Sequence, residues 1–254
     1  MAVEQVLAIE SKEQRAWRVT HPGEAAEIKV PPLESGDRLT RYEFERRYEA
    51  MPHVKKAELV EGVVYMPSAV RNSHSEAHAQ IVGWLLIYGV ATPGVHLGDN
   101  ATVRLDVDNE VQPDALLRLD HALGGQSHIS ADDYVEGAPE LIAEIAASSA
   151  SYDLYDKLHV YRRNGVQEYV VWQVYDKRVD WFRLSEGQYV SLTPDAAGVV
   201  HSQVFPGLCL AVTALLDGDL TRVLAELQKG LETAEHAAFV ERLSSQQKSR
   251  EEDH

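Results

Sequence analysis

Residues 140–161 read ELIAEIAASSASYDLYDKLHVY, and this stretch decides the fold. The apolar residues on both sides of Glu144 predict a buried β-strand over 141–147. Apolar residues at helical spacing predict a helix over about 152–163. A carboxylate inside a buried strand is costly unless a partner compensates its charge. Glu144 therefore needs a partner, and Lys157 on the following helix is the first candidate.

The rest of the chain alternates between helical and strand-like patterns. Thr40 and Glu43 fit a capping box that opens a helix, and helical spacing of apolar residues predicts two more helices, over 75–88 and about 212–245. Strands are expected over 57–66 (in two parts around a turn), 100–107, 111–119, 168–175, 178–184 and 188–192. This order predicts an α/β fold in which helices flank a mixed central β-sheet, with a further helix at the C-terminal end.

The 254 residues are enough for one large domain with appendages. We expect an N-terminal extension over 1–36, one α/β domain over 37–212, and a C-terminal helix with a charged tail over 213–254. No run of about 18 apolar residues is present, so no membrane span is predicted. The single cysteine, Cys209, excludes a disulfide within the chain and suits the reducing cytoplasm.

The charge balance is strongly acidic. The chain has 40 acidic and 24 basic residues, a formal net charge of −16, and Arg118 is the only basic residue between Leu105 and Asp156. Because lysine and arginine supply most phosphate contacts, this composition opposes nucleic-acid binding unless divalent cations lie among the carboxylates. Charge alone favours the simpler interpretation of a solvated acidic surface.

Three charged residues stand on otherwise apolar elements: Asp114, Glu144 and Lys157. If the strands that carry the two acids are neighbours, their carboxylates form a hard-oxygen site for Mg²⁺ or Mn²⁺. A lysine beside such a site orients water or offsets negative charge. The alternative is a buried Glu144–Lys157 salt bridge, with Asp114 capping a turn. The pattern of these residues leaves both interpretations open.

Six ordered blocks between about 38 and 212 resemble the Uma-type family of endonucleases, within the restriction-endonuclease-like PD-(D/E)XK superfamily. The blocks are ELVEG (58–62), His78 in HAQIVGWL, QPD (112–114), EIAAS (144–148), DLYDKLHVY (153–161) and GVQEYVV (165–171). Six blocks in a fixed order are far more specific than a single Pro-Asp pair. The resemblance implies a restriction-endonuclease-like core.

The resemblance also implies roles for individual residues. Asp114 and Glu144 would be the metal carboxylates and Lys157 the catalytic lysine, with Glu58 as an auxiliary acid. The superfamily usually places its lysine two residues after the second acid, where this chain has Ala146, so Lys157 would take that role from the next helix. Of the two histidines near position 75, we expect His78 to support the site and His74 to lie in an exposed loop.

The leading expectation is therefore a metal-dependent endonuclease that uses Mg²⁺ or Mn²⁺ to hydrolyse phosphodiester bonds of nucleic acid, with DNA as the first candidate. A homodimer is expected because cutting two strands commonly requires two sites, although no residue pattern marks its interface. Two alternatives remain, a catalytically inactive interaction module with the same fold and a hydrolase of small phosphoesters.

Overall fold

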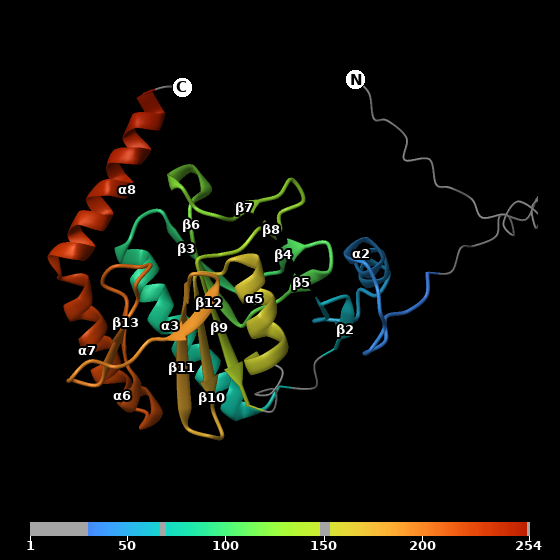
Figure 1. Cartoon of the computed structure of the whole chain (residues 1–254), viewed down its shortest axis with the longest axis horizontal. Coiled ribbons are helices and arrows are strands. Elements are labelled where there is room, and N and C mark those ends of the chain that lie inside the picture. Colours follow the sequence, from blue (N-terminus) through green and yellow to red (C-terminus); the bar gives the residue numbers. More distant parts are fainter. Residues whose placement is uncertain (1–29, 67–69, 148–152, 253–254) are drawn as a thin grey trace, which may run out of the picture.

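The computed structural model describes residues 30–66, 70–147 and 153–252 (Figure 1). Most of the extension expected over 1–36 and the first residue of the helix expected from 152 lie outside this part. Of the helices in the described residues, none combines the length and the apolar character that crossing a membrane requires.

A six-stranded mixed sheet forms the centre of the molecule, in the order β12-β11-β10-β9-β6-β3. Strands β9 and β10 are parallel, and the other neighbours are antiparallel. The strands are β3 (Val95–Asp99), β6 (Ala115–Leu119), β9 (Leu141–Ala146), β10 (Glu168–Gln173), β11 (Arg178–Ser185) and β12 (Gln188–Ser191). The adjacency of β6 and β9 confirms that the strands associated with Asp114 and Glu144 are neighbours.

Two helical segments cover opposite faces of this sheet (Figure 1). The π-helical turn η2 (Asp153–Lys157) and α5 (Leu158–Asn164) connect the parallel strands, since a parallel pair needs a crossover connection. Helix α5 ends at Asn164, and its C-cap residue, Gly165, has a left-handed conformation with φ of 84°. Helix α3 (Asn72–Ala91) packs on the other face.

A second, smaller sheet lies beside the central one, in the order β2-β1-β5-β4-β8-β7. Its strands are β1 (Glu58–Val60), β2 (Val63–Tyr65), β4 (Val103–Asp106), β5 (Asn109–Val111), β7 (His128–Ile129) and β8 (Val135–Glu136). Strands β1 and β2 form the predicted hairpin. A 3-10 turn, η1 (His121–Leu123), lies between β6 and β7.

Helix α2 (Arg41–Glu49) forms where expected, but the predicted capping box is wrong. Thr40 occupies the N-cap position, yet its side chain makes no capping hydrogen bond. Glu43 instead accepts hydrogen bonds from Arg46 and Arg47. These charge-assisted bonds hold its carboxylate one turn away from the helix start.

The C-terminal region is helical as predicted but is divided into several helices. After a hairpin of β13 (Val199–His201) and β14 (Cys209–Ala211) come α6 (Val212–Leu216), α7 (Leu220–Leu231) and α8 (Ala234–Glu252). The break between α6 and α7 coincides with Gly218, whose φ is 78°, and Asp219 caps the helix that follows. One continuous helix over 212–245 was therefore an incorrect expectation.

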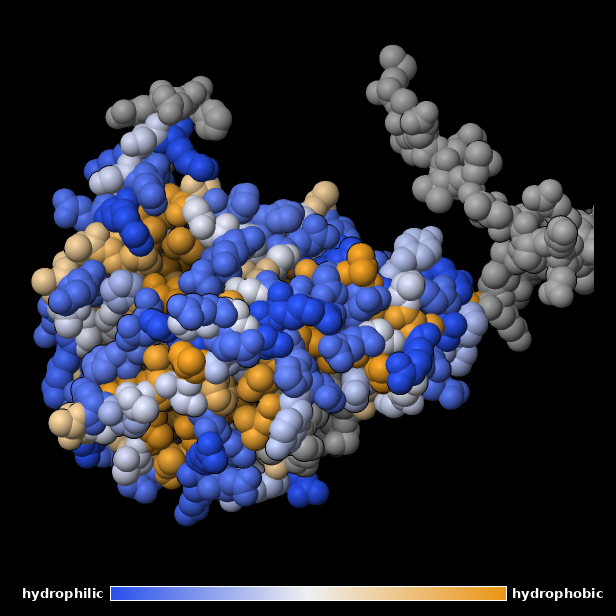
Figure 2. Space-filling model, viewed as in Figure 1, coloured by the Kyte–Doolittle hydropathy of each residue, from blue (hydrophilic) through white to orange (hydrophobic). Residues whose placement is uncertain are grey.

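The main core joins the sheet, α3 and the C-terminal helices in one apolar cluster. The buried face of α3 is the predicted set: Ala77, Ile81, Trp84, Leu85 and Tyr88. Cys209 is buried in the same cluster. Most of the surface seen in Figure 2 is hydrophilic, with hydrophobic residues between the polar ones.

Candidate active site

Asp114 and Glu144 lie opposite each other on neighbouring strands. Asp114 directly precedes β6, and Glu144 is the fourth residue of β9; the register pairs Ala115 with Ala143. The two acids are 5% and 3% exposed. The Ile145 N–H donates to Asp114 Oδ2 (2.7 Å), and the Asp114 N–H points to Glu144 Oε2 (3.4 Å). The sheet backbone thus fixes both carboxylates in one place.

Lys157 is buried between two carboxylates. Its Nζ lies 2.8 Å from Glu144 Oε1 and 2.9 Å from Glu58 Oε1. Tyr161, one helical turn later, donates its hydroxyl to Glu144 Oε1 (2.8 Å), and the Gln112 N–H donates to Glu58 Oε1 (2.7 Å). Strands β1 and β9 and the turn before α5 therefore meet at one ammonium group. The Glu144–Lys157 ion pair is therefore present. The alternative interpretation, in which these two residues form only a structural salt bridge, also predicts this pair.

His78 supports Asp114 from α3. Its Nε2 lies 2.8 Å from the Asp114 carbonyl oxygen and 3.0 Å from Asp99 Oδ1. Both partners are acceptors, so His78 Nε2 carries the hydrogen. The contact is with the backbone of Asp114, and a supporting role of His78 in the site stays a prediction.

Two residues beside the Asp114 side chain were missed by the sequence analysis. His74 Nε2 lies 3.5 Å and Lys56 Nζ 3.8 Å from Asp114 Oδ1. His74 is in the first turn of α3 and is partly buried, so its assignment to an exposed loop was wrong. The only sequence signal was its spacing of four residues from His78, which places both histidines on one face of a helix.

The electrostatic environment keeps Asp114 ionised. Burial by itself favours the neutral acid, but contact with His74, the charge of Lys56 and the Ile145 N–H outweigh burial and lower the pKa of Asp114 to about 2. The hydrogen bond with Asp114 in turn raises the pKa of His74. At neutral pH the side chain of Asp114 is therefore an ionised carboxylate, the form that a cation binds.

The donor chemistry of the site suits a hard divalent cation. No group of three or more His, Cys, Asp and Glu side chains within the described ranges is arranged to hold a metal ion. The candidate protein ligands are therefore two, the carboxylates of Asp114 and Glu144. Mg²⁺ is commonly held by one or two carboxylates while water and substrate phosphates supply its other ligands. The residues present fit that kind of site.

Two basic side chains lie beside Asp114 although the protein is acidic. Lys56 and His74 flank Asp114, and the neighbouring residues Lys55 and Arg71 are exposed. We call Lys55, Lys56, Arg71 and His74 the basic rim. Two separate segments, the loop before β1 and the start of α3, contribute to it. Lys56 and His74 thus lie beside Asp114, and Lys55 and Arg71 are their exposed neighbours along the chain.

Comparisons with known proteins agree on family and fold. The model of the Uma2 family, described as "Putative restriction endonuclease", matches residues 41–213. The fold is similar to the crystal structure of "a putative nuclease belonging to DUF820" from Anabaena variabilis ATCC 29413, with a TM-score of 0.55 and 13% identity over 68% of this chain and 96% of that chain. At this identity the structural likeness concerns the fold. No match was found among curated proteins.

Proposed function

The chain belongs to the Uma2 family of restriction-endonuclease-like proteins, and we propose that it is a metal-dependent endonuclease that hydrolyses phosphodiester bonds in DNA. The proposal assigns metal binding to Asp114 and Glu144 and a catalytic role to Lys157. Glu58 and His78 have auxiliary roles. The cation is Mg²⁺ or Mn²⁺.

The observation that carries this proposal is an excess of buried carboxylates. Glu58, Asp114 and Glu144 are each at most 5% exposed; the buried Lys157 is shared by Glu58 and Glu144, and Asp114 lies beside the less buried Lys56 and His74 at 3.8 Å and 3.5 Å. A structural salt bridge needs one carboxylate for one lysine, and each additional buried charge is costly. The excess is what a site for a divalent cation requires.

In the proposed reaction the protein groups mainly orient and stabilise charge. The bound cation would lower the pKa of a water molecule and offset charge on the phosphoryl oxygens. Lys157 and Tyr161 fix the orientation of the Glu144 carboxylate through the same oxygen. The ammonium of Lys157 also stabilises negative charge that develops on the phosphate. His78 holds the backbone of Asp114 in place.

The basic rim supports a polyanionic substrate. An interaction module without catalytic activity has no need for buried acids beside basic residues, and a small phosphoester has no further phosphates to contact the exposed residues Lys55 and Arg71. A nucleic-acid backbone places phosphates on both sides of the scissile one, and lysine and arginine are the residues that contact them. We favour DNA as the substrate. We further propose that the protein acts as a homodimer and that it does so in the cytoplasm.

The test combines metal binding with cleavage. Calorimetry with Mg²⁺ and Mn²⁺ should show binding to the wild type that is lost in Asp114→Asn and Glu144→Gln. Cleavage of plasmid DNA should fall by at least about 100-fold in both variants, since charge stabilisation of this kind contributes factors of roughly 100 to 1,000. Lys157→Met should retain metal binding and lose cleavage.

Glu168→Gln is a matched control, because Glu168 is a fully buried carboxylate on β10 that is held by Trp181, Ser202 and backbone N–H groups away from the site. It should retain metal binding and cleavage even where stability falls. Absence of metal binding to folded wild type at millimolar concentration would refute the proposal and favour the interaction module. Metal binding with cleavage of small phosphodiesters but no nucleic acid would favour the small-substrate hydrolase.

A further inference from the structure

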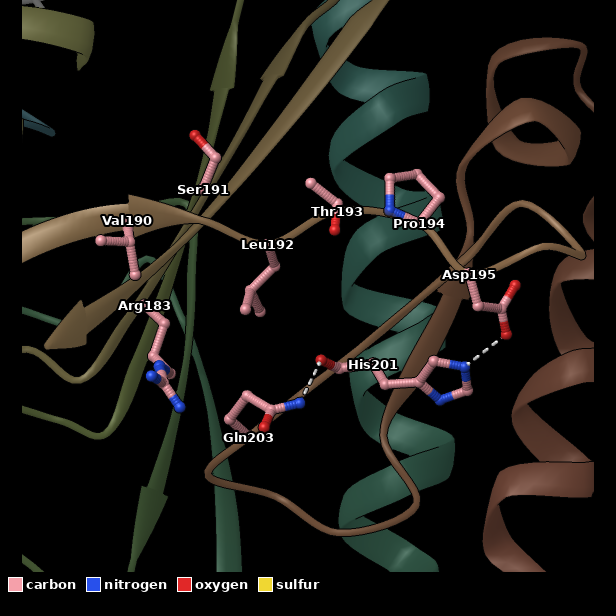
Figure 3. A pocket seen from close by; sticks show the side chains of 9 residues that line it. All are labelled: Arg183, Val190, Ser191, Leu192, Thr193, Pro194, Asp195, His201 and Gln203. Carbon is pink, nitrogen blue, oxygen red and sulfur yellow. Dashed lines mark hydrogen bonds and ion pairs between the residues drawn. The ribbon is translucent and has the colours of Figure 1, made fainter.

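A cavity of about 490 Å³ is lined by Arg183 and by residues of β12, β13 and the segments that follow them (Figure 3). Glu144 pairs with Val171, and Arg183 pairs with Glu168. Because side chains alternate along a strand, Glu168 and Val171, three residues apart, point to opposite faces. Arg183 therefore faces away from Glu144. The cavity is open to solvent beside strand β12, which forms one edge of the sheet.

The polar lining of the cavity comes from β11, β12, β13 and the segments that follow the last two. Arg183 and Gln203 line it together with the His201–Asp195 pair (Figure 3). The Gln203 amide nitrogen has only a long contact, 3.4 Å, with the His201 carbonyl oxygen. The side chain of Thr193 is a further polar group in the wall, whereas that of Ser191 points away from Arg183 (Figure 3). The wall thus combines one guanidinium, one carboxylate and uncharged polar groups.

Arg183 lines the cavity from strand β11. In the part of the chain that the structure describes, no carboxylate lies at ion-pair distance from it, and its Nε is buried with no hydrogen-bond partner. Arg178 on the same strand, by contrast, is paired with Asp180. A buried donor without an acceptor is costly, so such a group in a native protein calls for a specific explanation.

The nearest acid in the wall does not provide that explanation. Asp195 is engaged by His201 Nε2 at 3.0 Å and by the N–H groups of Ala197 and Val199. Glu168, the cross-strand neighbour of Arg183, accepts from Trp181, Ser202 and Gln203. Both carboxylates are held by other donors. The guanidinium is therefore directed toward the cavity rather than toward a protein anion.

We propose that this cavity binds a small molecule through an oxyanion group, a phosphate or a carboxylate, held by the terminal N–H groups of Arg183. The terminal N–H groups of a guanidinium form a fork that matches two oxygens of such a group. The polar side chains of Gln203 and Thr193 line the same cavity and can contact the remaining oxygens. The volume exceeds that of a bare ion and falls in the range of small-molecule sites. This site is independent of the proposed nuclease function.

Calorimetry on the full chain tests the proposal with three probes: inorganic phosphate, adenosine monophosphate and succinate. We expect at least one to bind the wild type with a Kd in the millimolar range or below. Arg183→Gln should weaken that binding at least 10-fold. Arg183→Lys should weaken it as well, because lysine keeps the charge but lacks the fork. Arg178→Gln, on the same strand but paired outside the cavity, should change the Kd less than twofold.

The pattern of binding identifies the source of the anion. Binding of phosphate and adenosine monophosphate without succinate indicates a phosphorylated ligand, and the reverse indicates a carboxylate. The proposal is overturned if none of the three probes binds the wild type at about 10 mM, or if folded Arg183→Lys binds as tightly as the wild type. If both Arg183 substitutions fail to fold, Gln203→Leu provides another variant. Unchanged binding of the probes to Gln203→Leu would then overturn the proposal.

Discussion

At the scale of single residues, Glu110 shows how strongly burial controls charge in this protein. Glu110 on β5 is 4% exposed and lies near Glu45 of α2. Burial, reinforced by the neighbouring Glu45, raises the pKa of Glu110 from 4.5 to about 8, although Arg104 opposes the shift. Arg104 Nε lies 2.9 Å from Glu45 Oε1 and 3.6 Å from Glu110 Oε2. Glu110 is therefore largely protonated in the folded protein at neutral pH.

This raised pKa predicts a specific pH dependence of stability. Between the unfolded value of 4.5 and the folded value of about 8, the folded state holds a proton that the unfolded state has lost. Its stabilising contribution is complete below pH 4.5 and is lost as the pH rises through 8. Glutamine is neutral at every pH. In Glu110→Gln the free energy of unfolding should therefore decrease less than in the wild type as the pH rises from 4.5 to about 8. Urea unfolding at several pH values measures this difference.

Glu186→Gln serves as the control, since Glu186 lies exposed in the turn between β11 and β12 and should leave the pH dependence unchanged. If Glu110→Gln follows the same pH profile as the wild type, then Glu110 is ionised in the folded protein and the assignment of its pKa is wrong.

The residues of the candidate site divide into those that sequence can reveal and those that it cannot. Asp114, Glu144 and Lys157 were identifiable because a charge inside an apolar pattern demands compensation. His74 and Lys56 interrupt no such pattern, and only the fold brings them beside Asp114. The roles that we assign to these residues remain predictions for the metal-binding and cleavage experiments.

At the scale of elements, the contact between α7 and the segment before β14 depends on two glycines. A Cβ on Gly230 of α7 would lie 2.1 Å from the Gly207 carbonyl oxygen and 3.1 Å from Cys209 Sγ. The backbone carbonyl of Gly207 cannot move away from an added Cβ as the end of a flexible side chain can. Gly230→Ala should therefore lower the free energy of unfolding by about 1–3 kcal/mol, as overpacking of a well-packed core usually does. Urea denaturation followed by circular dichroism measures this change.

Gly83→Ala is the matched control, because a Cβ at that position on α3 meets no atom within 4 Å. Alanine has the higher helix propensity, so this variant should be neutral or more stable by up to about 1 kcal/mol. Equal effects of the two substitutions would show that close packing at Gly230 does not limit the position of α7.

The helices and strands that could be predicted from the sequence are those with a strong local pattern of apolar residues. Strands β9 and β10 have long apolar runs and were placed correctly. Strand β3 was missed because its VHLGD sequence contains Gly98 and alternates poorly. The two residues each of β7 and β8 are too few to produce a period. The division of the C-terminal helix at Gly218 is set by a left-handed glycine that apolar spacing does not reveal.

At the scale of the whole molecule, the acidic net charge and the proposed substrate are reconciled by the placement of charge. A net charge of −16 repels a polyanion at long range. Lys56 and His74 of the basic rim lie 3.8 Å and 3.5 Å from Asp114, and salt screens the long-range repulsion within about 8–10 Å. Binding of DNA should therefore depend on a few local contacts, each of which releases counterions.

The placement of these charges predicts how DNA affinity responds to salt. The Lys55→Gln, Arg71→Gln double variant should bind labelled duplex DNA more weakly in EDTA, and the slope of log K against log salt should become shallower by about 1–2. Fluorescence anisotropy over about 50–200 mM salt measures this slope. The matched control is Arg222→Gln with Lys229→Gln, which removes one arginine and one lysine from the exposed surface of α7. If both double variants change the slope equally, overall charge governs DNA binding and the basic rim has no specific role.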